Sequence, residues 1–373
     1  IVMSVDAMDF EDLEYLGTLP HFRQLLQEGR IQGLVSIGGS GGTTLATHVM
    51  RALPIGFPKV IATTQACSDK LPGFISGKDI IVINSVVDVS GLNSIISHVY
   101  DEAAGAVVGA ALAVSGTLMQ GVFRNPMAEP GLLGVSSGAA LGAAAAMLLG
   151  LQASLLGFSA VSLCAFAGGA LAVLLVMGIA GLGRGGLTTL LLCGVAVSSF
   201  LSALLSGLLS INHEALESVY MWTLGTFASA SYGDAALVAA VLLVGLMGSM
   251  ALARDLNAVS AGGDARMLGV DAPRVRLLAL LLSTLLTATA VSVSGVIGFV
   301  GLTAPHAVRR LTGADHRSLL PLSALAGGLF LLLADALSRS LFAPAELPVG
   351  VTTSLFGGPF FLILIRRYRG GRA

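Results

Sequence analysis

The stretch from residue 107 to residue 150 reads VVGAALAVSGTLMQGVFRNPMAEPGLLGVSSGAALGAAAAMLLG. Two apolar segments, which we place at 107–123 and 131–151, flank a polar turn at 124–130. An α-helix needs about 20 apolar residues to cross the hydrocarbon core of a bilayer. The stretch therefore predicts two membrane-spanning helices, and the prolines of the turn interrupt helical hydrogen bonding between them.

Further apolar segments follow at 154–181, 187–211, 235–253, 277–308, 318–340 and 348–366. The segment 277–308 is too long for one straight span, and Gly295, Gly298 and Gly301 predict a break within it, which gives about nine spans. The chain is 55% hydrophobic and 11% charged, with a mean hydropathy of +0.88, whereas soluble domains carry about 25% charged residues. This composition excludes an ordinary cytosolic enzyme, a disordered protein and a nucleic-acid binder, and it indicates membrane lipid as the surroundings.

The arginines beyond residue 107 orient these spans. One set of alternate loops carries Arg124, Arg184, Arg254, Arg266, Arg274, Arg276, Arg309, Arg310, Arg317 and the tail arginines Arg366, Arg367, Arg369 and Arg372. Arg339 is the exception, because it falls among the loops of the opposite set. Cytoplasmic loops of membrane proteins are enriched in Lys and Arg, so the first set is predicted to be cytoplasmic.

Residues 1–106 have a different character, since they hold 11 of the 21 acidic residues. Strand-like runs at 31–37, 59–64 and 79–87 alternate with helical patterns at 10–28, 43–53 and 92–104. Such alternation predicts a parallel α/β sheet. The sequence therefore predicts an α/β fragment at 1–106 and a mainly α, polytopic membrane domain at 107–373.

A glycine-rich loop follows the first predicted strand and consists of Gly38, Gly39, Ser40, Gly41, Gly42 and Thr43. Glycines permit tight turns, and free N–H groups at a helix start attract anions, so this loop is a candidate phosphate site. It is not a Walker A loop, because no Gly-Lys-Ser/Thr follows. Nucleotide binding and a plain strand-to-helix turn both remain open.

Two family resemblances match these two parts. Residues 1–105 resemble part of an α/β family that includes the ATP-binding domain of a plant tobamovirus-resistance protein. The glycine-rich loop and the segments 50–56 and 85–93 carry this resemblance, which implies nucleotide binding at the loop. Residues 107–373 resemble the FecCD family, the permease subunits of cobalamin, haem and ferric-siderophore ABC importers. This resemblance is carried by motifs at 124–138, 294–306, 313–317 and 345–350.

The FecCD resemblance implies an inverted-repeat, type II ABC importer permease in a bacterial plasma (inner) membrane. Its cargo would be an iron chelate, haem or a ferric siderophore, with cobalamin also possible, and the sequence does not distinguish them. The implied partners are a second copy of the chain, two ATP-binding cassette subunits and an extracytoplasmic substrate-binding protein. ATP would bind the partner ATPase, so neither a cofactor nor enzyme activity is expected in this chain.

The same resemblance implies three sites. The cytoplasmic gate would consist of Arg124, Asn125, Pro126 and Met127. The ATPase-coupling loop would contain Asp264, Ala265, Arg266, Met267, Leu268 and Gly269, where the sequence predicts a short amphipathic helix with Arg on one face. Arg339 and Glu346 would dock the binding protein, although a simple pair between Arg339 and Asp335, one helical turn earlier, is the alternative.

A metal site is not expected from the residue pattern. His306 is a single histidine with no carboxylate or histidine at i+3 or i+4, and a site normally needs several clustered donors. The three cysteines, Cys67, Cys164 and Cys193, show no metal or disulfide spacing.

The chain departs from the family pattern at its start. Permeases of this family have ten helices, and the α/β fragment stands where the first helix is expected. Nine spans with a cytoplasmic end at residue 366 would place the fragment outside, so we expect poor transport. A natural fusion, a non-functional chimaera and a soluble-type nucleotide-binding protein anchored by the helices remain alternatives.

Overall fold

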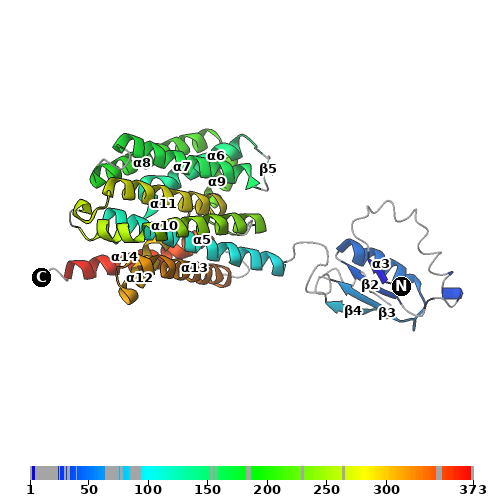
Figure 1. The fold of residues 1–373 in the computed structure, drawn as a ribbon. Helices are drawn as coiled ribbons and strands as arrows, with labels where there is room; N and C mark the ends of the chain where they lie inside the picture. The colour runs from blue at the N-terminus through cyan, green and yellow to red at the C-terminus, as the bar shows by residue number, and fades with distance from the viewer. Residues whose placement is uncertain are drawn as a thin grey trace. The chain divides into compact units, whose positions relative to one another are not determined.

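The computed structural model describes the chain outside residues 1, 5–23, 25, 29–30, 32–33, 39, 64–74, 76–78, 85–93, 152–153, 156–157, 182–185, 228–230, 263–264, 342–346 and 371–373. The chain divides into two compact units, Ile1–His98 and Val99–Ala373. Figure 1 shows a small sheet with a covering helix in the first unit and a bundle of long helices in the second.

The first unit is built on a parallel sheet. Its strands are β1 (Val2–Ser4), β2 (Leu34–Gly38), β3 (Lys59–Thr63) and β4 (Ile81–Asn84), and they lie in this order across the sheet. Helix α3 (Ser40–Ala52) connects β2 to β3 and buries Val49 and Met50 in one cluster with Ile61. This arrangement agrees with the predicted α/β pattern. The predicted helix 10–28 lies almost entirely outside the described residues.

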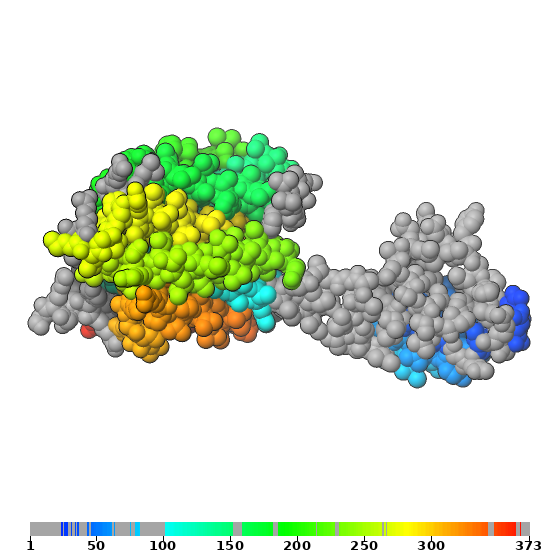
Figure 2. Space-filling model, viewed as in Figure 1, coloured from blue at the N-terminus to red at the C-terminus, as the bar shows by residue number. Residues whose placement is uncertain are grey.

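The second unit is a helix bundle. Its helices are α5 (Ser94–Phe123, which begins before the unit boundary), α6 (Val135–Leu148), α7 (Ala160–Ala180), α8 (Leu187–Ile211), α9 (Leu216–Thr223), α10 (Tyr232–Ser260), α11 (Ala272–Ser294), α12 (Val300–Thr312), α13 (His316–Ser340) and α14 (Val349–Gly370). Single 3₁₀ turns are η2 (Pro130–Leu133), η3 (His213–Ala215) and η4 (Ala265–Leu268), and a small hairpin pairs β5 (Ser154–Leu155) with β6 (Phe158–Ser159). Figure 2 shows α10 and α11 side by side across one face of this bundle.

The predicted membrane helices are confirmed as helices, and they differ in length. Within the described residues, six are long and apolar enough to cross a membrane: Asp101–Phe123 of α5, and α7, α8, α10, α11 and α13. The other predicted spans correspond to α6, α12 and α14, in which the continuous apolar helix is shorter. The bundle therefore combines full-length helices with short ones.

The predicted segments 92–104 and 107–123 form one helix, α5, so the predicted domain boundary at 106 falls inside a continuous helix. The residues at that boundary contain no proline, and the alanines among them favour a helix, so the change in composition does not interrupt it. The contact boundary lies instead between His98 and Val99.

The predicted break in 277–308 is confirmed. Helix α11 ends at Ser294, and Gly295 follows with a φ of 70°. Its backbone approaches that of Trp222 so closely that an added Cβ would lie 2.2 Å from the Trp222 carbonyl oxygen. Glycine is therefore required here both by the backbone angle and by the contact. Gly301, in contrast, lies within the first turn of α12.

Candidate functional site

The turn between α5 and α6 joins two distant helices at its start. Arg124 has a left-handed backbone, with a φ of 51°, and its Nε donates to the Val259 carbonyl oxygen of α10 at 2.6 Å. The Oγ of Ser260 donates to the carbonyl oxygen of Gly121 at 3.1 Å. The end of α10 is thus bound to the end of α5 by two hydrogen bonds at the start of the turn.

The predicted gate residues lie in this turn and are accessible. Arg124 and Asn125 are exposed, and Pro126 and Met127 are part-buried. The Asn125 side chain accepts the N–H of Met127 at 3.0 Å, so it stabilises the turn that it belongs to. The structure brings the four residues together on one turn, and their role as a gate stays a prediction.

The end of the same turn contacts the break between α11 and α12. Oε1 of Glu129 accepts the backbone N–H of Phe299 at 2.9 Å, across 170 positions of sequence. Sequence reasoning placed Glu129 inside the turn motif and did not find this contact, because neither residue type indicates its partner.

The loop from α10 to α11 contains the predicted coupling residues Ala265, Met267, Leu268 and Gly269; Asp264 and the Arg266 side chain lie outside the described residues. The predicted short helix is a single 3₁₀ turn, Ala265–Leu268, and its arginine face stays a prediction. Gly262 and Gly269 have φ values of 91° and 73°, and left-handed residues end a right-handed helix on either side.

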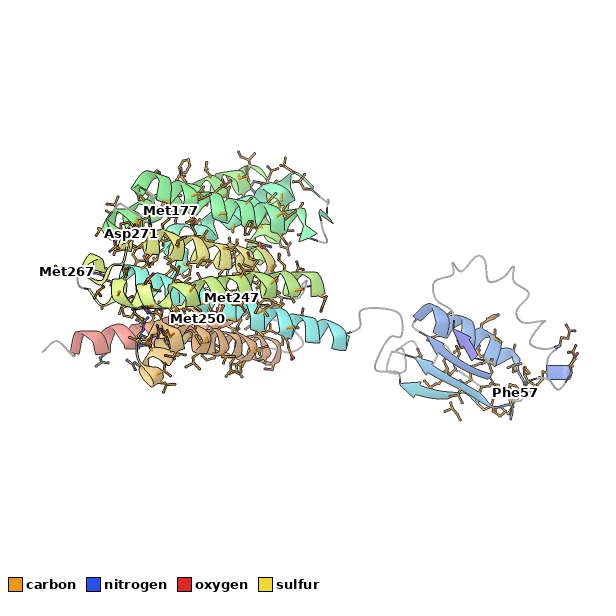
Figure 3. All side chains as sticks on the ribbon, in the orientation of Figure 1. Phe57, Met177, Met247, Met250, Met267 and Asp271 are labelled. Atoms are coloured by element: carbon orange, nitrogen blue, oxygen red, sulfur yellow. The ribbon has the colours of Figure 1, made fainter. Side chains whose placement is uncertain are left out.

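Two apolar side chains project from this loop. Met267 is 87% exposed and Leu268 is 68% exposed, while Ala265 is buried. Figure 3 shows Met267 at the end of the bundle, beyond the helix ends. Asp271 caps α11 and pairs with Arg274 at 2.9 Å, so the loop is anchored where α11 begins. The structure adds an exposed apolar pair to the loop that the family resemblance implied for coupling.

A polar cluster ties the end of α10 to the start of α13. Oδ1 of Asn257 accepts the backbone N–H of His316 at 2.9 Å and lies 2.6 Å from its ring Nδ1. Nδ2 of Asn257 donates to Asp315 at 2.6 Å. The backbone N–H of Arg317 and the Asn257 amide hold the pKa of Asp315 below its ordinary value. Sequence reasoning found the motif around Asp315 and missed Asn257, which lies 58 residues earlier.

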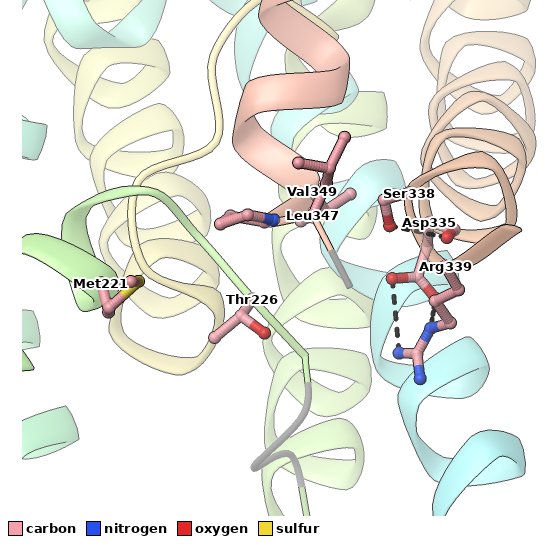
Figure 4. A pocket seen from close by; sticks show the side chains of 8 residues that line it. Met221, Thr226, Asp335, Ser338, Arg339, Leu347 and Val349 are labelled. Carbon is pink, nitrogen blue, oxygen red and sulfur yellow. Dashed lines mark hydrogen bonds and ion pairs between the residues drawn. The ribbon is translucent and has the colours of Figure 1, made fainter. Parts of the chain in front are cut away.

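The opposite end of the bundle carries Arg339. Its Nε lies 2.9 Å from Asp335, and its Nη1 lies 3.1 Å from Asp101 of α5. Figure 4 shows Arg339 and Asp335 beside a pocket of about 280 Å³, which Thr226 and Val349 also line. The predicted pair with Asp335 is present, and Asp101 adds a second carboxylate. Glu346 lies outside the described residues.

The glycine-rich loop of the first unit is short. Strand β2 ends at Gly38 and α3 begins at Ser40, so Gly41, Gly42 and Thr43 already belong to the helix; Gly39 lies outside the described residues. The Thr43 hydroxyl is buried against that of Thr63. Nucleotide binding here stays a prediction.

His306 lies buried in α12, with its ring 6.1 Å from that of Phe360 in an edge-on contact. Among the described residues, no group of three or more histidine, cysteine, aspartate or glutamate side chains is placed to hold a metal ion. Polar clusters lie at both ends of the bundle, around Asn257 at one end and around Arg339 at the other. The accessible gate turn and coupling loop lie at the Asn257 end.

Comparison with known proteins gives this arrangement a context. The chain matches the FecCD transport family over residues 92–367, and residues 16–115 match the N-terminal domain of the uncharacterised protein family UPF0261. It is 43% identical over 270 residues to the hemin transport system permease protein HmuU of Yersinia pestis, with 72% of this chain and 81% of HmuU covered. It is 46% identical over 264 residues to the cobalamin import system permease protein BtuC of Halobacterium salinarum, with 70% of each covered. A solved metal-chelate type ABC transporter in an inward-facing conformation is 36% identical, with a TM-score of 0.65 and coverage of 72% of this chain and 86% of its own.

Proposed function

The chain belongs to the FecCD transport family, and we propose that it carries an iron chelate, either haem or a ferric siderophore, with cobalamin as the nearest alternative. It is a multi-pass permease of an ABC importer, and ATP hydrolysis lies in a separate subunit. The observation that supports the cargo class is its similarity to permeases named for hemin, cobalamin and iron(3+)-hydroxamate. In the assembly that we propose, two copies of the chain combine with two ATPase subunits and one extracytoplasmic binding protein.

We place the gate at the turn formed by Arg124, Asn125, Pro126 and Met127. The turn lies on the arginine-rich side, which is the side predicted to face the cytoplasm, and three of its features support the assignment. It is exposed, it is internally stabilised by Asn125, and its first residue is bonded to α10. A movement of α10 relative to α5 would therefore displace the turn directly.

We place ATPase coupling at the α10–α11 loop, from Asp264 to Gly269. Met267 and Leu268 expose apolar surface at the end of the bundle. Exposed apolar side chains on a fixed loop are suited to fill a groove of a partner protein. The Asp271 cap holds the loop at the start of α11, so force on the loop would reach both helices.

We place the docking of the binding protein at Arg339 and Glu346. Arg339 lies at the end opposite the gate, where its side chain is 18% exposed between two carboxylates. Those carboxylates fix the direction of the guanidinium, and an external carboxylate would have to approach its remaining exposed edge.

The decisive experiment measures ATP-dependent uptake into proteoliposomes that contain the chain with its ATPase subunit. Binding protein loaded with labelled haem, with a ferric hydroxamate or with cobalamin is added outside, and vesicles without ATP are the control. We expect accumulation of one iron chelate, at the low rate expected for a chain in which the α/β fragment stands in place of the first family helix. Accumulation of cobalamin alone would overturn the cargo proposal, and a lack of all three would overturn transport by this chain.

A further inference from the structure

The first turn of α12 lies against the middle of α5. Leu112 is the central residue of the span Asp101–Phe123. A Cβ added to Gly301 would lie 2.8 Å from the Leu112 carbonyl oxygen, and one added to Gly116 would lie 1.8 Å from the Gly301 carbonyl oxygen. The backbones are therefore in direct contact, and α12 begins halfway along a full-length helix instead of at its end.

Glu129 reaches this same point from the turn between α5 and α6. Its Oε1 accepts the N–H of Phe299, the residue that immediately precedes α12, and the Phe299 side chain does not cap the helix. A carboxylate at a helix N-terminus is favourable because the helix dipole is positive there. An N–H group left without an acceptor at this depth would be costly, because the surroundings supply little water.

Phe299 is also constrained from the other side. Its φ is 67°, a left-handed angle that side-chain-bearing residues rarely adopt. A Cβ added to Gly357 of α14 would lie 2.4 Å from the Cβ of Phe299. Helix α14 therefore packs closely against Phe299 and leaves it no room to move in that direction. Such backbone geometry persists where the surrounding contacts hold it, and these contacts are Glu129 and Gly357.

A small cavity of about 40 Å³ lies beside this contact. Its lining residues include Glu129, Ser136 and Thr287, whose side chains carry oxygen, and apolar residues such as Leu112 and Ile297. The volume is sufficient for a water molecule, which needs about 10–15 Å³ by this measure. The cavity therefore leaves space for a water molecule beside the Glu129 contact.

We propose that Glu129 is a positioning residue for transport: its carboxylate fixes the mid-span start of α12 to the gate turn, so that a movement of α12 is passed to residues 124–127. At its other end, α12 leads through Gly313 to Asp315, which Asn257 bonds to the end of α10 next to the coupling loop. The contacts thus run continuously from the coupling loop to the gate turn. This inference rests on the proposed roles of those two segments.

The contact itself is tested by hydrogen exchange on the full chain in lipid nanodiscs. Glu129→Leu removes the acceptor, and peptides that cover 297–303 should exchange about 10- to 100-fold faster, the range expected for a lost hydrogen bond to a charged group. Glu129→Gln keeps an acceptor oxygen and should restore most of the protection. Ser136→Ala is the matched control, since it removes a hydroxyl from the same cavity without touching the contact. Unchanged exchange in Glu129→Leu would overturn the proposal.

Transport kinetics then separate a positioning role from a purely structural one. In proteoliposomes with the ATPase subunit, Glu129→Leu should lower the maximal uptake rate at least tenfold and leave the half-saturating concentration of loaded binding protein unchanged, while Glu129→Gln recovers. Equal uptake by Glu129→Leu and the unmodified chain would overturn the role even if exchange is faster. If Glu129→Leu does not insert, the Gln variant decides alone: a loss of rate in an inserted Glu129→Gln chain that keeps its exchange protection would show that the hydrogen bond is not what positions α12. Failure of the unmodified chain to transport would count against the proposed function, and the exchange result would stand separately.

Discussion

Substitution of Gly116 by alanine tests the closest contact in the bundle. The new Cβ would lie 1.8 Å from the Gly301 carbonyl oxygen and 2.6 Å from the Gly301 Cα. Ordinary carbon–oxygen contacts are about 3.3 Å, so α5 and α12 would have to separate by about 1.5 Å. Because both atoms that it meets belong to the backbone, no side-chain rotation can relieve the overlap.

The size of the effect follows from two opposing contributions. Overpacking costs about 1–3 kcal/mol, and the upper end applies where the backbone must move. Alanine in place of glycine in a helix interior returns about 1 kcal/mol. We therefore expect Gly116→Ala to lower the free energy of unfolding by about 2 kcal/mol or more. Gly207 of α8 is the matched control, because a Cβ there meets nothing within 4 Å, and Gly207→Ala should be neutral or stabilising.

The assay is reversible unfolding in mixed micelles, followed by the fluorescence of Trp222, the single tryptophan of the chain. Uptake measured on the same preparations should fall in Gly116→Ala and persist in Gly207→Ala. If both variants unfold at the same denaturant concentration, then α5 and α12 do not touch at Gly116, and the placement of the α12 start at mid-span is wrong.

Three further outcomes are expected. Met267→Asp should uncouple ATP hydrolysis from uptake in an intact complex. Leu149→Asp, at another exposed apolar position, should leave the two coupled. Coupled uptake by the Met267→Asp variant would contradict the coupling assignment. Arg339→Leu leaves two carboxylates buried without their cation and should cost about 3–5 kcal/mol in the same micelle assay, and neutralising both carboxylates as well should recover most of it. The Lys59 ammonium and a backbone N–H lower the pKa of Asp79 to about 2, so this pair stabilises the first unit above pH 4 and the stabilisation is lost as the pH falls from about 4 towards 2. Exchange of β3 amides in the full chain should rise over that interval, and Asp79→Asn should abolish the dependence.

The apolar segments were readable from the sequence because length and hydropathy are local properties. The helices lie where these segments are. The break after α11 falls at Gly295, one of the glycines for which the sequence predicted a break. The sequence also indicated the parallel α/β character of the first unit. The lengths of the apolar segments did not reveal which helices are full spans. Helices α6 and α12 are shortened because each begins after a left-handed residue, and those backbone angles depend on tertiary contacts.

The contacts that give the site its shape were beyond local reasoning. Asn257 meets Asp315 across 58 residues, and Glu129 meets Phe299 across 170. Asn257, Asp315 and Glu129 are of types common on protein surfaces, and Phe299 takes part through its backbone N–H, so the local sequence does not single out any of them. The family resemblance implied the coupling loop, whereas the exposure of its two apolar side chains is known only from the structure.

The two short helices have a common origin in the fold. Gly134, with a φ of 84°, precedes α6, and Phe299, with a φ of 67°, precedes α12, so each helix starts from a left-handed residue. Glu129 lies at the start of the 3₁₀ turn that leads into α6, and it also accepts the N–H that precedes α12. Interrupted helices in membrane transporters place helix ends and irregular backbone where the protein must rearrange. Because full-length helices such as α5 and α13 are held together by backbone contacts at Gly109 and Gly327, we expect them to move as one body. Glu129 joins the starts of α6 and α12, so we expect a displacement of one start to be passed to the other.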